Sequence, residues 1–118
     1  MEAFERLEVW QRSSRLCVEI YKALDNSKDR GFKDQATRSA LSVPSNIAEG
    51  YERNTRIEYA RFLKIAKGSC GELRTQLYIG SEAGFLGKPN AQTFIKEATE
   101  ITKMLQGLIQ KIASKDPA

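Results

Sequence analysis

The sequence predicts one all-α domain over residues 1–118, an antiparallel up-down-up-down bundle of four helices. Three observations lead to this prediction. In four stretches, apolar residues recur every three or four positions, as they do on the buried face of a helix. Short polar or Gly/Pro-containing connections separate these stretches, which favours antiparallel neighbours. No segment alternates apolar and polar residues over the length of a strand.

The first two helices are expected over residues 8–24 and 33–53, separated by a polar linker that ends in glycine. The apolar face of the first consists of Trp10, Cys17, Ile20, Tyr21 and Leu24. The stripe of the second consists of Ala36, Ala40, Val43, Ile47 and Tyr51. Pro44 cannot donate a hydrogen bond to the carbonyl of Ala40, so we expect either a kink or two shorter helices that meet at this proline.

The third and fourth helices are expected over residues 56–83 and 91–113. A capping box over residues 55–58 begins the third helix, and Gly84 suits the left-handed residue that ends it. Asn90 is the expected N-cap of the fourth helix. The seam of that helix consists of Phe94, Ala98, Ile101, Leu105, Leu108 and Ile112, in steps of three and four.

Two glycines, Gly68 and Gly71, lie in the middle of the expected third helix on either side of Ser69. Each costs about 1 kcal/mol of helix stability relative to alanine. We expect their small size to let a neighbouring helix approach closely, and a local kink is the alternative.

The stretch over residues 39–48 contains no charged residue. An ordinary bundle helix has one buried face and one charged face, so a neutral circumference predicts cover on more than one side. We expect a second copy of the chain to supply this cover, and exposure of small polar groups to water is the alternative. The candidate subunit-interface residues are Leu41, Ser42, Pro44, Ser45, Asn46, Ala48 and Glu49.

A basic stripe follows on the third helix. Six basic and two acidic residues lie over residues 53–74, and this excess equals the net charge of +4 of the whole chain. The candidate nucleic-acid-binding residues are Arg53, Arg56, Arg61, Lys64, Lys67 and Arg74. All except Arg61 fall within a wedge of roughly 80° on a helical wheel. Such a stripe can bind phosphate groups and release their counterions. The alternative is a basic helix face that is only exposed to water and binds no partner.

The composition excludes several classes of site. The chain has no histidine, so it cannot contain a Ser-His-Asp or Cys-His nucleophile or a histidine-bound zinc ion. Its two cysteines, Cys17 and Cys70, are expected to be reduced thiols in the core. Glu49 is best explained as the ion-pair partner of Arg38 or Arg53. We expect no catalytic residue, metal or cofactor, and an enzyme that works without histidine is the remaining enzymatic hypothesis.

The N-terminal residues lack the apolar core of a signal peptide, and no window approaches about 18 consecutive apolar residues. We therefore expect a cytoplasmic protein that makes no membrane contact.

Residues 34–50, which read DQATRSALSVPSNIAEG, resemble the signature of the four helix bundle protein family. This family was first noticed as reading frames inside intervening sequences of bacterial 23S rRNA genes. Residues 56–73 resemble its second block, and residues 4–21 resemble its start. The likeness therefore spans nearly the whole chain.

The resemblance implies a left-handed antiparallel bundle that assembles as a homopentameric ring around a central channel. The family's biochemical role is not established. The accessory variability determinants of diversity-generating retroelements are structurally similar basic pentamers, which bind a reverse transcriptase and nucleic acid. The implied ring and the basic stripe together lead us to expect a non-enzymatic scaffold that binds RNA or a ribonucleoprotein through its third helix. The alternative is a nucleic-acid-binding accessory protein, for RNA or DNA, that partners a reverse transcriptase.

Overall fold

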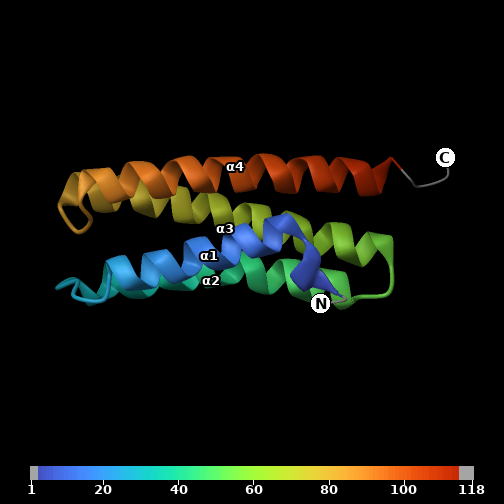
Figure 1. Cartoon of the computed structure of the whole chain (residues 1–118), viewed down its shortest axis with the longest axis horizontal. Helices are drawn as coiled ribbons and strands as arrows, with labels where there is room; N and C mark the ends of the chain where they lie inside the picture. Colours follow the sequence, from blue (N-terminus) through green and yellow to red (C-terminus); the bar gives the residue numbers. More distant parts are fainter. Residues whose placement is uncertain (1–2, 115–118) are drawn as a thin grey trace.

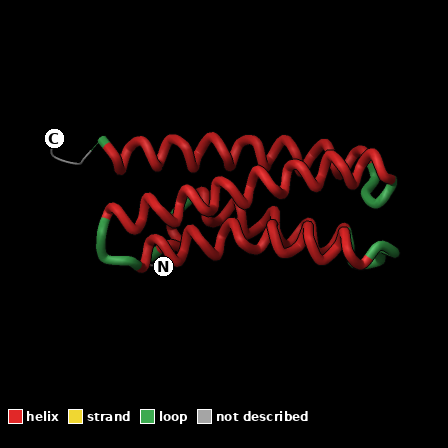
Figure 2. The backbone as a smooth tube through the Cα atoms, turned by 180° about the vertical axis from the view of Figure 1, so that it is seen from behind, coloured by secondary structure: helices red, strands yellow, loops and turns green. Residues whose placement is uncertain are grey.

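The computed structural model describes residues 3–114. A short 3₁₀ helix, η1 (Phe4–Arg6), precedes the four helices α1 (Glu8–Ala23), α2 (Arg30–Glu52), α3 (Arg56–Ala83) and α4 (Lys88–Ala113). The chain reverses direction at each connection (Figure 1), and the view from behind shows the same elongated arrangement (Figure 2). These residues include no strand, and the predicted all-α four-helix bundle is confirmed.

Each helix packs on two others. α2 lies between α1 and α3, and α4 lies between α3 and α1, with the most extensive contact between α2 and α3. All four helices contribute large side chains that are shielded almost completely from water: Ile20, Leu24, Ile47, Leu63, Leu73, Leu77, Ile101 and Leu105. Each such side chain contributes about 1.5–3 kcal/mol through the hydrophobic effect. None of the described helices combines the length and apolar character needed to cross a bilayer.

α2 begins at Arg30, three residues before its predicted start. The reason is its N-cap, since the Asp29 carboxylate accepts a hydrogen bond from the backbone N–H of Phe32 at 2.8 Å. The final residues of the polar linker therefore form the first helical turn. The helix continues without interruption through the buried Pro44, so the alternative of two shorter helices is wrong.

The predicted bounds of α3 are confirmed. Thr55 Oγ1 accepts a hydrogen bond from the backbone N–H of Glu58 at 3.1 Å, and Gly84 ends the helix with a φ of 82°. The predicted N-cap of α4 is wrong, because that helix begins at Lys88 with Gly87 before it. Pro89 occupies the first turn, where its missing N–H would have had no intrahelical partner, and Asn90 lies inside the helix.

The prediction that Gly68 and Gly71 allow close packing within the bundle is wrong. A Cβ atom added at either position would meet no atom within 4 Å. Both glycines lie on the side of α3 that faces away from the other helices of the protomer.

The close approaches are made at Gly50 of α2 and Gly80 of α3. A Cβ atom at Gly50 would lie 2.7 Å from Phe62 Cβ and 3.2 Å from the carbonyl oxygen of Tyr59. A Cβ atom at Gly80 would overlap the ring of Phe32. The two glycines thus set the distance between α2 and α3 at both ends of their contact.

We predict that Gly50→Ala lowers the free energy of unfolding by about 1–3 kcal/mol, because the new methyl group has no space against Phe62. Urea denaturation followed by circular dichroism measures this change. Gly107→Ala on α4 is the matched control, because a Cβ atom there meets nothing within 4 Å. The control should be neutral or stabilising by up to about 1 kcal/mol. Equal stability of the Gly50→Ala variant and the wild type would contradict the assigned close approach.

Candidate functional site

Contacts within the chain cover part of the neutral stretch of α2. Ser42 Oγ lies 2.8 Å from Ser69 Oγ of α3, in a hydrogen bond that joins the two helices. Asn46 Nδ2 donates to the carbonyl oxygen of Ser42 at 2.8 Å and to its hydroxyl at 3.0 Å. Pro44 is buried. Ser42, Pro44 and Asn46, three of the seven candidate interface residues, are therefore hydrogen-bonded or buried inside the protomer.

The rest of this candidate set faces outward. The Leu41 side chain is 49% exposed, Ser45 is exposed and Ala48 is half-buried. Glu49 is exposed and lies 3.4 Å from Arg53 Nε, which confirms the predicted ion pair. The part of the stretch that is open to a partner is therefore narrower than the sequence suggests, with Leu41 as its one large apolar side chain.

Leu41 lies beside the exposed Tyr21 of α1, and the exposed Val18 lies one helical turn before Tyr21. Val18 is 50% exposed and Tyr21 is 44% exposed, and Tyr21 and Leu41 together line a shallow hollow of about 380 Å³. The expectation that Tyr21 belongs to the core is wrong, because it lies on the edge of α1 nearest α2 rather than on the inner face. We call Val18, Tyr21 and Leu41 the α1–α2 patch.

Two cations of the basic stripe surround an aromatic ring at the start of α3. The guanidinium carbons of Arg53 and Arg61 lie 4.9 and 5.2 Å from the centre of the Phe62 ring. Both side chains also approach the Glu58 carboxylate, Arg61 at 3.4 Å and Arg53 at 3.9 Å. This carboxylate neutralises part of the positive charge at that point.

The other four cations differ in their surroundings. Arg56 and Lys64 are exposed. Lys67 is half-buried and its ammonium group donates to Gln106 Oε1 of α4, while Arg74 is also half-buried. The six predicted residues are therefore divided among the end of α2, the outward face of α3 and the seam with α4.

A basic hollow of about 580 Å³ lies at the beginning of α3, where α3 meets the end of α4. No carboxylate is among its lining residues, which are Arg56, Ile57, Ala60, Arg61, Lys64, Ile65, Ile112 and Ala113. Its apolar floor includes the most exposed large apolar side chain in the described part of the chain, Ile57, at 76%. This hollow combines positive charge with an apolar surface that the protomer itself does not cover.

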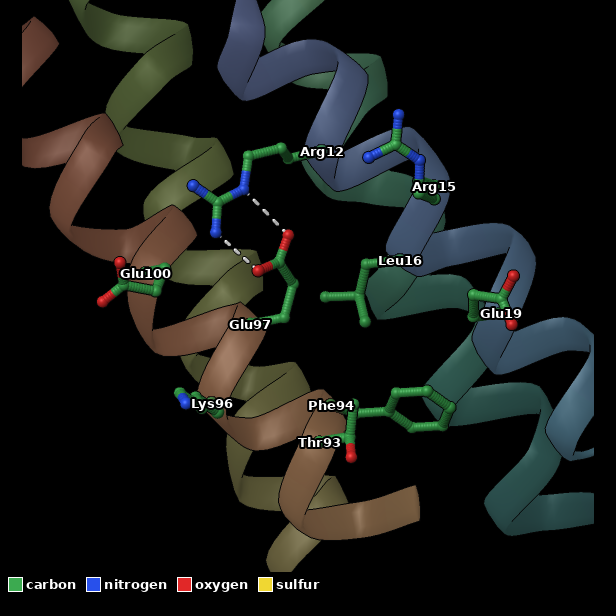
Figure 3. Close-up of a pocket in the computed structure, with 9 residues that line it drawn as sticks. All are labelled: Arg12, Arg15, Leu16, Glu19, Thr93, Phe94, Lys96, Glu97 and Glu100. Carbon is green, nitrogen blue, oxygen red and sulfur yellow. Dashed lines mark hydrogen bonds and ion pairs between the residues drawn. The ribbon is translucent and has the colours of Figure 1, made fainter. Parts of the chain in front are cut away.

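A second groove, of about 420 Å³, lies between α1 and α4 (Figure 3). Leu16 and Phe94 form its apolar floor, and the Arg12 guanidinium meets the Glu97 carboxylate at its side through bonds of 2.9 and 2.6 Å. The hydrogen bond from Arg12 lowers the pKa of Glu97 below its ordinary value. Charges of both signs line the rest of the groove: Arg15, Glu19, Lys96 and Glu100.

The ion pair of Arg12 and Glu97 could not be predicted from the sequence, because 85 residues separate the two and no local pattern relates them. It joins α1 and α4, which have the least extensive contact of all the neighbouring helix pairs in the bundle.

The two cysteines are free thiols inside the bundle, as predicted. Burial raises the pKa of both, and the Cys70 thiol donates to the carbonyl oxygen of Ala98 at 3.2 Å. Residues 3–114 contain no group of three acidic or cysteine side chains placed to hold a metal ion.

Comparison with known proteins gives a family and a fold. The model of a family described as 23S rRNA-intervening sequence protein matches residues 5–107. A crystal structure of a protein of unknown function from the S23 ribosomal protein family of Bacteroides thetaiotaomicron is similar, with a TM-score of 0.80 and 27% sequence identity. The match covers 86% of this chain and 97% of that chain. No curated protein sequence matches. The chain therefore belongs to the 23S rRNA-intervening sequence protein family.

We predict that Glu97→Gln lowers the free energy of unfolding by about 1–2 kcal/mol at pH 7, because it removes the charge that Arg12 binds in a partly exposed groove. The pKa of Glu97 is depressed in the folded state, so its stabilising effect is present above the ordinary pKa of about 4.5 and disappears as the pH falls through the lower, folded pKa. Urea titrations from pH 7 down to about pH 3 should therefore show the variant and the wild type converging in acid.

Glu100→Gln is the matched control in the same groove, because this exposed carboxylate pairs with Lys103 at 3.8 Å and acts on Arg12 only through a Coulombic attraction weaker than that of Glu97. We expect a change below about 0.5 kcal/mol. A Glu97→Gln effect of that size at pH 7, or one that does not depend on pH, would contradict the role of the ion pair.

Proposed function

We propose that this member of the 23S rRNA-intervening sequence protein family is a non-enzymatic scaffold, whose copies form a homopentameric ring through α2 and the adjoining edge of α1. The observation that supports this assembly is the exposed α1–α2 patch. Tyr21 and Leu41, 44% and 49% exposed, line one hollow, and Val18 and the small neutral Ser45 each lie one helical turn from one of them. Burying them between copies removes apolar surface from water, and Asp34 and Arg38, which line the same hollow, place charges of both signs beside the contact.

The partner that we propose for the ring is RNA, alone or in a ribonucleoprotein. The support is the basic hollow at the start of α3, where Arg56, Arg61 and Lys64 converge and no carboxylate lines the surface. Phosphate groups can bind such cations and release counterions. A ring repeats the hollow once in each protomer, which would increase the number of phosphate contacts made by one RNA molecule.

We predict that light scattering at micromolar concentration gives the wild type a mass of five protomers, and that Ser45→Arg lowers this mass. Ser45 is exposed, so the variant should fold, whereas arginine would introduce an unpaired charge into the contact. Asn46 is less suitable for this test because it is hydrogen-bonded inside the protomer. Gln92→Arg, at an exposed position of α4, should leave the mass unchanged. A monomeric wild type, or a Ser45→Arg variant of full mass, would overturn assembly through α2.

We predict that fluorescence anisotropy with labelled single-stranded RNA shows binding at about 50 mM salt that weakens steeply as the salt concentration rises. Arg61→Gln and Lys64→Gln should each weaken binding for all sequences and reduce the salt slope by about 0.7 per lost phosphate contact. Lys103→Gln on α4 is the charge-matched control and should have little effect. A DNA of the same sequence shows whether the site prefers RNA. Absent binding, or a response that does not depend on salt, would contradict a phosphate-binding role.

A further inference from the structure

The outward face of α3 separates its charges along the helix. Arg61 and Lys64 lie in the first half, and Glu72 and Glu82 lie in the second half, all of them exposed. A second copy of this face in the antiparallel direction would place its acidic half against the basic half of the first. The face is therefore electrostatically complementary to itself in one orientation only.

Large apolar side chains are exposed at both ends of the same face. Ile57 and Ile65 line the basic hollow, while Tyr78 and Ile79, 58% and 56% exposed, line a second hollow of about 420 Å³ together with Glu82. Between 41% and 76% of the surface of each of these apolar residues stays exposed in the described protomer. Apolar surface rimmed by charge is typical of protein–protein contacts, whereas phosphate binding alone does not need it.

The centre of the face carries Gly68 and Gly71, where an added Cβ atom would meet nothing within 4 Å. Each glycine lowers helix stability by about 1 kcal/mol relative to alanine, and no contact inside the protomer compensates for this loss. Without side chains at these two positions, a helix from outside could approach the backbone of α3 between its basic and acidic halves.

We propose that the outward face of α3 binds the same face of a second copy, antiparallel and about a twofold axis, with Gly68 of one copy opposite Gly71 of the other. This register brings Lys64 of each copy within one helical turn of Glu72 in its partner. The two ion pairs are equivalent by symmetry, as they must be in an isologous contact. The contact is separate from the proposed ring contact, which uses α2.

The same register accounts for the ends of the face. Arg61 lies opposite Tyr78 of the partner copy, where the cation can pack on the exposed ring. Ile57 lies opposite Glu82. Tyr78 and Ile79 of each copy therefore enter the basic hollow of the other copy. The exposed apolar side chains and the segregated charges are thus buried or paired in one arrangement.

The proposal is tested by exchanging charges between two copies. Lys64→Glu alone places two carboxylates together in each pair of the homodimer, and Glu72→Lys alone places two ammonium groups together. In a dimer of one Lys64→Glu copy with one Glu72→Lys copy, both contacts are attractive again. We expect the dissociation constant of the α3 contact to rise at least about tenfold in each single variant and to return close to the wild-type value in the equimolar mixture.

Sedimentation velocity over a range of concentrations, with a fluorescent label on one variant, measures this effect. The experiment is run on the wild-type chain and repeated in the Ser45→Arg background, where the remaining association comes from α3 alone. Unchanged sedimentation of both single variants, or a mixture that associates as weakly as they do, overturns the α3 pair. Neither result depends on whether the α2 ring forms or RNA binds.

A second variant tests the centre of the contact. Gly68→Leu should leave the thermal midpoint of the protomer unchanged or raised, because the position is open, yet it should weaken the α3 contact at least about tenfold. Gly107→Leu, which is equally open on α4, is the control and should leave association unchanged. Wild-type association of the Gly68→Leu variant contradicts the proposed register.

Discussion

The close contact between α2 and α3 is the constraint on which the rest of the bundle depends. Three points fix it: Gly50 lies under Phe62 at one end, Gly80 lies against Phe32 at the other, and Ser42 is hydrogen-bonded to Ser69 between them. At both ends a side chain on one helix fills the space that a glycine leaves on the other. Because these contacts occur at matching intervals along two antiparallel helices, they determine both the spacing and the register of the pair. Burial of Leu63, Leu73 and Leu77 follows from that register.

This packing also decides which surfaces remain open. Ser42 is hydrogen-bonded to Ser69 of α3 and Asn46 to Ser42, so the neutral stretch of α2 exposes only Leu41, Ser45 and part of Ala48. On α3, Ser69 and Cys70 are both buried, so Gly68, which lies about 200° around the helix from Cys70, faces outward. The surfaces proposed for assembly are therefore consequences of the α2–α3 contact.

Local signals in the sequence predict the four helices and both ends of α3, because a Thr cap and a left-handed glycine act within a few residues. They mislead at α2 and α4, where more than one residue could serve as N-cap and the bundle uses Asp29 and Gly87. The buried face of α3 was readable from its apolar spacing, and it would have placed Gly80 inward and Gly68 outward. The pairing of Arg12 with Glu97 has no local signal, because it exists only after α1 and α4 have come together.

The charge arrangement of α3 permits two uses that exclude each other at one protomer. Lys64 and Glu72 are eight residues apart, about 12 Å along the helix axis, which exceeds the Debye length of about 8 Å at physiological salt. In a single protomer, salt therefore screens much of the effect of the acidic half on the attraction of Arg61 and Lys64 for a phosphate. In an antiparallel pair the two halves come into direct contact, and the same cations are taken by Glu72 and Tyr78 of the other copy. A protomer paired through α3 would thus have lost two of the three cations of the proposed RNA site, so the two proposed partners would compete for one face.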